Sequence, residues 1–429
     1  MFGFANFLLL ALFAAAVFDL IFALARGGGL RGALHGLWNT PRLLFGQQLA
    51  EWRLQLGRIL FAAGLAAYEI SVVFCNSMAR QNWAWVQGVM SPVLEWLAFL
   101  CFGAKILFGT RYTWRELLAG GALYFVARWV YFNSQNIWWI GIVVAVLAAK
   151  DVPLRRPLQV YFASGCAAMA VVLALHFAGI VAPDLTSERM GALRGTYGYG
   201  HPNTFGGLVF GLVLAYALLR AQKVRWVDCL LVFAVGVFLL VGPASRSAAL
   251  CTLALAVGLV FCRLRAGHSV PRWWPGTCAG MVGLTAAVSY LLPLLVIKVG
   301  PWNNDIGPAW LAKLDSLLTC RISLTWMAYR LLDVKIAGQV FNWPTVDNSF
   351  AFALFQFGPV VAALLGILFA AALLGHAKQG RRVEVCCLFA MLAYAYMEVQ
   401  PFHLTTNPTA LLLCGAVFAQ TSARWQKIE

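Results

Sequence analysis

Apolar windows long enough to cross a lipid bilayer recur along the whole chain, and this feature most limits the folds open to it. In hydrocarbon, backbone polar groups must be satisfied within the protein, so such a series of windows predicts a bundle of membrane-spanning helices. Only 11% of the 429 residues are charged, too few to cover a soluble protein of this length. We therefore predict an all-α, polytopic integral membrane protein with a single transmembrane domain, residues 1–429. The thirteen predicted spans are 4–24, 59–78, 86–108, 116–132, 136–149, 157–182, 203–219, 227–244, 247–262, 276–297, 350–374, 384–399 and 409–422.

Lysine and arginine are concentrated in alternate connections between these spans. Because such residues accumulate in cytoplasmic loops, we expect these connections to face the cytoplasm, with the N-terminus outside and the C-terminus inside. Much of the formal net charge of +16 is then a topology signal with affinity for anionic membrane lipids, and it requires no nucleic-acid partner. The basic residues of this set are Arg26, Arg31, Arg42, Arg53, Arg58, Lys105, Arg111, Arg115, Lys150, Arg155, Arg156, Arg220, Lys223, Arg225, Arg263, Arg265, Arg272, Lys378, Arg381, Arg382, Arg424 and Lys427.

The remaining basic residues are more informative, because most of them lie on the predicted outer face, against the topological bias. One explanation is pairing with acidic residues of the same face. The alternative is that Arg194, Arg246 and Arg321, near predicted helix ends with few acids beside them, bind phosphate, since the guanidinium fork matches phosphate oxygens. The remaining basic residues are Arg80, Arg128, Arg189, Arg194, Arg246, Lys298, Lys313, Arg321, Arg330 and Lys335, and the candidate acids are Asp184, Glu188, Asp305, Asp315, Asp333 and Asp347.

The longest connection, residues 298–349, is predicted to be a large extracytoplasmic loop. Its segment 309–334 has apolar residues near helical spacing, which predicts one or two amphipathic helices on the outer face. Residues 341–350, "FNWPTVDNSF", contain proline and asparagine and are predicted to form a turn that leads into the span 350–374.

Five polar motifs lie on the predicted outer face. They are "LRGTYGYGHPNTFGG" (193–207), "SRSA" (245–248), "LDSLLTCRISL" (314–324), "VDNSFAFALFQFGPV" (346–360) and "YMEVQPFHLTTNPTALLL" (396–413). In this order they resemble the motifs of Wzy-type polysaccharide polymerases, members of the O-antigen polymerase and ligase superfamily. The resemblance covers roughly residues 55–422.

The resemblance implies a GT-C-like glycosyltransferase fold in the bacterial inner membrane. Members of this family join undecaprenyl-pyrophosphate-linked oligosaccharide repeats on the outer leaflet, which produces a capsule, exopolysaccharide or O-antigen. The implied partners are that lipid-linked oligosaccharide, membrane lipids, and flippase and chain-length regulator proteins. The related ligases have a histidine where this chain reads "DN" (347–348), and this difference favours a polymerase.

The chemistry of such a transfer can be argued from the residues themselves. A pyrophosphate leaving group needs its developing charge neutralised, by a metal or by fixed cations. The outer acids are scattered and show no D-x-D or H-x-x-H pairing, so we expect no metal and no cofactor. The cations would be Arg194, Arg246 and Arg321. Asp347 or His201 would accept the proton of the acceptor hydroxyl, and direct displacement would invert the donor linkage.

Each candidate base has a structural alternative. Asp347 could cap the helix of the span 350–374, a role that Asn348 or Ser349 could share. His201 could orient the start of its span together with Pro202.

Further residues are expected to contact the substrate. Tyr197 and Tyr199 could stack on sugar rings or belong to the interfacial aromatic belt. Arg128 and Glu398 lie near outer helix ends and could line the cavity, although Arg128 could instead pair with Glu69 or Glu95 inside the bundle. The complete set of expected substrate-binding residues is Asn203, Tyr197, Tyr199, Asn348, Arg128, Glu398, His403 and Asn407.

Two other functions fit part of the pattern. A ligase, which transfers finished glycan to another acceptor, shares nearly all of these features. A flippase for lipid-linked oligosaccharide would also place polar groups inside its spans, but it would usually show two related halves and charge along a central path. The unusual polar residues of this chain gather on one face, which favours a reaction site.

Overall fold

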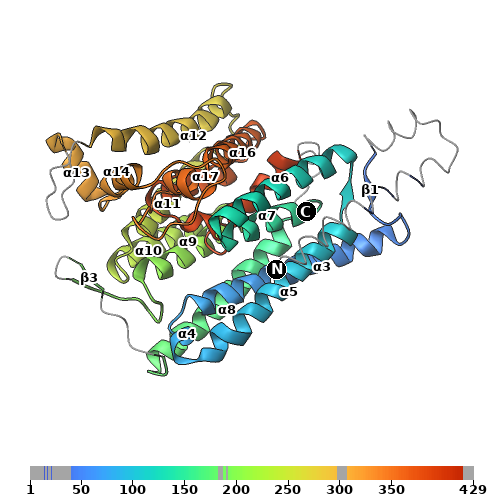
Figure 1. Ribbon diagram of the computed structural model, residues 1–429, viewed down its shortest axis with the longest axis horizontal. Coiled ribbons are helices and arrows are strands. Elements are labelled where there is room, and N and C mark those ends of the chain that lie inside the picture. The colour runs from blue at the N-terminus through green and yellow to red at the C-terminus, as the bar shows by residue number, and fades with distance from the viewer. Residues whose placement is uncertain are drawn as a thin grey trace.

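The computed structural model describes residues 40–181, 187–189, 192–296 and 307–418, together with the isolated positions 14, 17 and 21 (Figure 1). Apart from those three positions, the predicted span 4–24 lies outside the described residues. The described chain is mostly helical. Its only named strands form two short antiparallel pairs, β1 (Arg42–Leu43) with β2 (Arg111–Tyr112), and the hairpin of β3 (Ser187–Arg189) with β4 (Ala192–Arg194).

The helical elements are joined by connections of very different lengths, the longest between α8 and α9. In chain order they are α3 (Ala50–Cys75), α4 (Ala79–Asn82), η1 (Val86–Met90), α5 (Ser91–Phe108), α6 (Trp114–Ser134), α7 (Ile137–Ala148), α8 (Arg155–Phe177), α9 (Pro202–Leu219), α10 (Trp226–Val241), α11 (Arg246–Leu264), α12 (Trp274–Leu291), η2 (Leu292–Leu295), α13 (Ala309–Leu317), α14 (Arg321–Leu331), α15 (Ser349–Phe352), η3 (Ala353–Phe357), α16 (Pro359–Lys378), α17 (Arg382–Met397), η4 (Gln400–Phe402), η5 (Pro408–Leu413) and α18 (Cys414–Val417).

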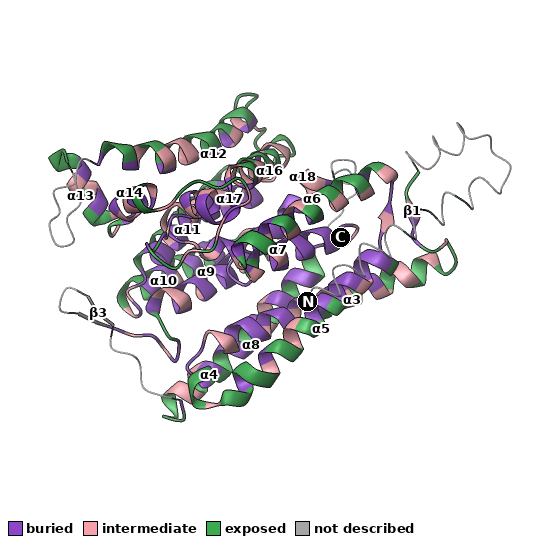
Figure 2. Ribbon diagram, in the orientation of Figure 1, coloured by how far each residue is buried: buried purple, intermediate pink, exposed green. Residues whose placement is uncertain are grey.

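Seven helices within the described residues are long and apolar enough to cross a membrane. They are α3, η1 with α5, α8, α9, α11, α12 with η2, and α16; α7, α10 and the segment 408–417 are shorter apolar helices. The structure therefore confirms a membrane-embedded, all-α protein. Large apolar side chains are exposed along the outside of the bundle, as on Leu230, Leu231 and Phe233 of α10, which is the surface expected to face lipid (Figure 2).

Helix α9 lies at the centre of the bundle. Of its membrane-spanning window 72% is buried, whereas α12 and α16 are each only 22% buried and lie at the periphery (Figure 2). Helices α8, α11 and α17 all pack against α9. The glycines of α9 permit this close approach, since a Cβ atom on Gly206 would collide with Ser245, and one on Gly207 with Gln400. The start of α9 is thus held against the segments that build the candidate site.

The predicted continuous span 350–374 is wrong in one respect, because the helix is interrupted at Gly358. Segments α15 and η3 end at Phe357, and α16 begins at Pro359. Gly358 has φ +88°, and a Cβ atom there would collide with the carbonyl of Ile336. Proline then starts the next helix, a position it favours because its missing N–H needs no partner there. The Gly-Pro signal was present in the sequence.

The described part of the long loop, residues 307–349, lies at one end of the bundle, together with connections that were predicted to face outside (Figure 1). Helices α13 and α14 occupy the segment where amphipathic helices were expected. Figure 1 shows both helices at the same end as α4 and the β3–β4 hairpin, and the β1–β2 strand pair at the opposite end. Residues 297–306 of this loop lie outside the described residues.

Candidate active site

Glu398 lies at the centre of the polar residues that gather at this end. It follows the last residue of α17 in an extended conformation, and only 4% of its surface is exposed. Its Oε1 atom accepts hydrogen bonds from Arg321 Nη2 (3.0 Å), Asn203 Nδ2 (3.0 Å) and Ser247 Oγ (2.8 Å). One buried carboxylate oxygen therefore connects three segments that are far apart in the sequence.

Arg321 is the first residue of α14 and is nearly buried. Its Nη2 atom contacts two carboxylates, Glu398 at 3.0 Å and Asp347 Oδ2 at 3.4 Å. Its Nε donates to the carbonyl of Met397 (2.9 Å), and its Nη1 donates to the carbonyl and hydroxyl oxygens of Thr319. Both sides of the guanidinium fork are thus bonded to protein, which fixes the position of this charge.

Arg194, at the end of β4, reaches the same carboxylate through an asparagine. Its Nη2 donates to Asn203 Oδ1 (2.9 Å) and to the carbonyl of Ala244 (3.2 Å). Since Asn203 also donates to Glu398, Arg194 and Arg321 belong to one connected set. We call Arg194, Asn203, Ser247, Arg321, Asp347 and Glu398 the polar network.

Three helices begin at the polar network. Asn203 is the second residue of α9, Ser247 the second of α11 and Arg321 the first of α14. The N-terminus of a helix carries unsatisfied N–H groups and the positive end of the helix dipole, so it favours anions. The three helix ends and the arginines therefore make this region suited to an anionic ligand, although Glu398 and Asp347 already offset part of the positive charge.

Arg246 and Asp347 are the charged groups of this region with the best access from outside. Arg246 is exposed, and its side chain has no hydrogen bond or ion pair with any residue that the structure describes. Its neighbours hold its backbone in place, because Ser245 Oγ donates to Asn203 (3.5 Å) and Ser247 Oγ to Glu398. The Asp347 side chain is 24% exposed and contacts Arg321.

Asn348, not Asp347, is the N-cap of α15. Asn348 caps α15, because its Oδ1 accepts from the backbone N–H groups of Phe350 (2.9 Å) and Ala351 (3.1 Å). Its Nδ2 donates to Ser289 (3.1 Å), so this side chain is occupied by the protein itself. The hypothesis that Asp347 is the cap is wrong, and Asp347 remains a candidate base.

His201 caps α9, which fits the structural alternative that it orients the start of its span. Its Nδ1 accepts from the backbone N–H of Asn203 (3.1 Å), which places the proton of a neutral imidazole on Nε2. The ring is exposed and adjoins the polar network through Asn203. In this tautomer His201 has no nitrogen lone pair facing solvent, which makes Asp347 the better-placed base.

The two tyrosines differ in their access to a ligand. Tyr197 is half-buried and stacks on Phe205, with ring centroids 5.0 Å apart. Tyr199 is fully buried beside the same phenylalanine and pairs through its backbone with Ser77. Tyr199 therefore offers no surface for a sugar in this structure, and its packing is that of a core residue.

Three other predicted substrate contacts lie outside the polar network. Arg128 lies over the ring of Phe132 at 5.2 Å and makes no ion pair with Glu69 or Glu95, so the expected pairing inside the bundle is wrong. The direction in which a side chain points from α6 depends on packing that residue spacing alone does not show.

His403 and Asn407 belong to the connection after α17. His403 packs against Trp138, with ring centroids 3.7 Å apart, and burial lowers the pKa of His403 to about 3, so the ring is neutral at physiological pH. Asn407 is buried and caps η5 through the N–H of Ala410 (3.1 Å), while its Nδ2 donates to Pro401. Asn407 thus has a structural role here.

Sequence reasoning missed three polar residues that complete the site. Ser245 and Ser247 flank Arg246 and bond to Asn203 and Glu398. Gln400 donates to the backbone carbonyl of Asn203 (3.2 Å) and accepts from Tyr394. The two serines could have been found from their position, since serine at a helix start commonly satisfies polar groups there.

The described residues contain no group of three or more histidine, cysteine, aspartate or glutamate side chains that could hold a metal ion. The comparisons with known proteins add no relative. No family model matches the chain, and neither a curated protein nor a solved structure matches it.

Proposed function

We propose that the polar network is the active site of a membrane glycosyltransferase that polymerises undecaprenyl-pyrophosphate-linked oligosaccharide repeats. The observation that supports it most is the connection of Arg194 and Arg321, from separate segments, through Asn203 and Glu398 at the start of three helices. Such an arrangement presents positive potential to an anionic leaving group without a metal. The sequence resemblance supplies the substrate class.

The contacts suggest a division of roles among the three arginines. Arg321 and Arg194 are nearly buried and bonded to protein oxygens, so they supply fixed charge and hold the site together. Arg246 has an exposed guanidinium and is the group best placed to bind the pyrophosphate bidentately. Positive charge near the leaving oxygen would stabilise the transition state more than the ground state.

Asp347 is the proposed general base. It is partly exposed, is not required as a helix cap and is held by Arg321. It would take the proton from the acceptor hydroxyl as that oxygen attacks the anomeric carbon, while the C–O bond to the pyrophosphate breaks and the electron pair leaves with the pyrophosphate. A single displacement of this kind inverts the donor linkage.

The proposal includes the finer architecture. It comprises thirteen spans in a GT-C-like arrangement in the bacterial inner membrane, with the polar network outside, the N-terminus outside and the C-terminus inside. Cysteine labelling from each side of the membrane tests this orientation in a Cys166→Ser/Cys320→Ser background, since these are the exposed native thiols among the described residues. Exposed Gln81 and Thr345, replaced by cysteine, should label from outside, and exposed Lys223 and Ala266 from inside.

The function itself is tested by deleting the gene and separating the lipid-linked glycans by size. Loss of a polymerase leaves single repeats that have reached the outer leaflet. Loss of a flippase traps the repeats in the inner leaflet, and loss of a ligase leaves long lipid-linked chains without their final acceptor. Either of the last two outcomes would contradict the proposal.

A further inference from the structure

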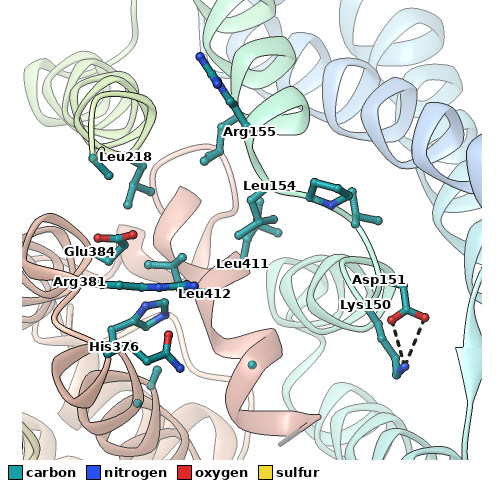
Figure 3. A pocket seen from close by; sticks show the side chains of 18 of the residues that line it. Lys150, Asp151, Leu154, Arg155, Leu218, His376, Arg381, Glu384, Leu411 and Leu412 are labelled. Atoms are coloured by element: carbon teal, nitrogen blue, oxygen red, sulfur yellow. Dashed lines mark hydrogen bonds and ion pairs between the residues drawn. The ribbon is translucent and has the colours of Figure 1, made fainter. Parts of the chain in front are cut away.

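A cavity of about 890 Å³ lies at the end of the bundle opposite to the polar network. The central helix shows this directly, since Asn203 at the start of α9 belongs to the network, while Leu218 and Leu219 at its end line the cavity. The 18 residues of α9 separate the two regions by roughly 27 Å. Arg155 at the start of α8 and Glu384 near the start of α17 also line the cavity (Figure 3).

The lining carries an excess of positive charge. Seven of its residues are lysine or arginine and three are acidic. Some of these cations already have carboxylate partners: Lys150 contacts Glu116 (3.3 Å) and Asp151 (3.4 Å), and Arg220 contacts Asp228 (3.1 Å). The acidic groups of these pairs are therefore already occupied, and some other cations of the lining have no carboxylate partner among the described residues.

Three cations of the lining remain available. The side chains of Arg58, Arg155 and Lys223 are exposed and have no hydrogen bond or ion pair with any residue in the described part of the chain. They come from separate segments: α3, α8 and the turn after α9. An anion bound between them would therefore contact three segments of the bundle at once.

Much of the remaining lining is apolar, although Thr113, Gln222, His376 and Gln379 also belong to it. Figure 3 shows Leu154 and Leu411 near the centre of the cavity, Leu412 beside Arg381 and His376, and Leu218 on the side away from the Lys150–Asp151 pair. Leu158 and Ala372 also belong to this lining. These side chains are largely buried by the protein, so only a small part of the apolar wall is open to the cavity. A hydrated inorganic anion would leave that part against water, whereas a ligand with both an anionic group and a hydrocarbon portion would cover it.

We propose that this cavity binds an anionic phospholipid of the adjacent leaflet. The headgroup phosphate would lie among Arg58, Arg155 and Lys223, and the upper part of the acyl chains would lie on the leucines. Basic pockets between membrane helices recognise anionic headgroups in this way. The proposal does not depend on the reaction at the other end of the bundle. A bound lipid would join α3, α8 and the α9–α10 turn and so stabilise the folded state.

The test uses the purified full-length chain in a neutral detergent, with thermal unfolding as the readout. The chain is titrated with phosphatidylglycerol, with phosphatidylcholine of the same acyl chains, and with inorganic phosphate. We expect phosphatidylglycerol to raise the midpoint temperature of unfolding at concentrations where the other two do not. An equal shift with phosphatidylcholine would show that charge plays no part, and an equal shift with inorganic phosphate would show a soluble-anion site. Either result, or no shift with phosphatidylglycerol, overturns the proposal.

Two matched variants locate the effect. Arg58→Gln/Arg155→Gln/Lys223→Gln should weaken phosphatidylglycerol binding by about a hundredfold, on the order of fivefold for each cation removed. Arg263→Gln/Arg265→Gln/Arg272→Gln removes the same charge from exposed residues of the same predicted face that do not line the cavity, and should bind as the unaltered chain does. Equal losses in both variants would show non-specific attraction and contradict the proposal.

A single substitution tests the site even if the triple variant does not fold. Lys223 lies in an exposed turn, so Lys223→Gln should fold normally. Native mass spectrometry should then detect fewer retained phosphatidylglycerol molecules on this variant than on the unaltered chain, by about fivefold in apparent affinity. Unchanged retention would contradict the assignment of Lys223 to the headgroup site.

Discussion

The two ends of helix α9 handle charge in opposite ways. At its start, the charges of Arg194, Arg321 and Glu398 are nearly buried and connected to one another by hydrogen bonds. At its end, Arg155 and Lys223 are exposed at a cavity with both charged and apolar walls and have no carboxylate partner within the described residues. Buried charges must be paired, whereas exposed cations can remain free until a ligand arrives. The charges at the start of α9 therefore have a fixed geometry, while the exposed cations at its end are available to bind an anion.

This comparison distinguishes roles within the candidate active site as well. Arg321 is buried and hydrogen-bonded through all of its guanidinium nitrogens, while Arg246 is exposed like the available cations of the cavity. Asp347 combines features of both, because it is paired with Arg321 and is also partly exposed. Variants of these three residues should therefore affect catalysis and stability to different extents.

The largest effect is expected from Asp347→Asn. Asparagine keeps the size of the side chain but cannot accept a proton, and a general base contributes about 10²–10⁴-fold to a transfer rate. Chain growth by the purified protein from lipid-linked repeats should fall by that factor, with thermal stability close to normal because Asn348 supplies the cap. Asp333→Asn, an exposed acid of the same loop, serves as the control. Normal chain growth in Asp347→Asn would leave His201 as the candidate base.

A large loss of stability is expected from Arg321→Met. This change leaves the buried carboxylate of Glu398 without its cation, which typically costs ~3–5 kcal/mol. The free energy of unfolding, measured by denaturant titration, should fall by about that amount. Arg330→Met, an exposed arginine on the same helix, should change it by less than ~1 kcal/mol. Equal stability of the two variants would mean that the polar network does not hold this end together.

A smaller and purely catalytic effect is expected from Arg246→Lys. Lysine keeps the charge but loses the planar fork, so the transfer rate should fall by roughly tenfold to a hundredfold. Because Arg246 is exposed, the midpoint temperature of unfolding should not change. Arg272→Lys, on the opposite predicted face, is the matched control for the rate. A fully active Arg246→Lys would mean that the pyrophosphate is not held bidentately by this residue.

The smallest effect is expected from removing divalent cations. If arginines neutralise the leaving group, excess EDTA should change the rate of chain growth by no more than about twofold. Loss of activity in EDTA and its recovery with magnesium or manganese would show that a metal, and not the arginines, performs this role.

Much of the fold was predictable because hydropathy and helix breaks are local properties. Each of the seven long apolar helices overlaps a predicted window, but several differ from it in their bounds, and α3 begins at Ala50, well before the predicted span 59–78. The interruption at Gly358–Pro359 had a signal in the sequence that the hydropathy of the window obscured. The pairing of side chains was much less predictable. Arg321 meets Glu398 across 77 residues, and nothing in either motif alone shows this contact.

Side-chain direction was the second limit. Tyr197 and Tyr199 are two residues apart in the same motif, yet one is half-buried and the other has no exposed surface. Arg128 was expected to meet Glu69 or Glu95, but its partner is the ring of Phe132 on its own helix. Rotations of helices and loops follow from packing in three dimensions, which a one-dimensional pattern does not contain.

The central claim is that the start of α9, and not its end, binds the lipid-linked donor. The most direct test measures binding of an undecaprenyl-pyrophosphate-linked repeat to the purified chain in excess phosphatidylglycerol, which would occupy the cavity. Arg246→Gln should bind the donor about tenfold to a hundredfold more weakly, the loss expected for charge-assisted hydrogen bonds, whereas the Arg58, Arg155 and Lys223 triple variant should bind it normally. Normal binding by Arg246→Gln together with weak binding by the triple variant would contradict the account.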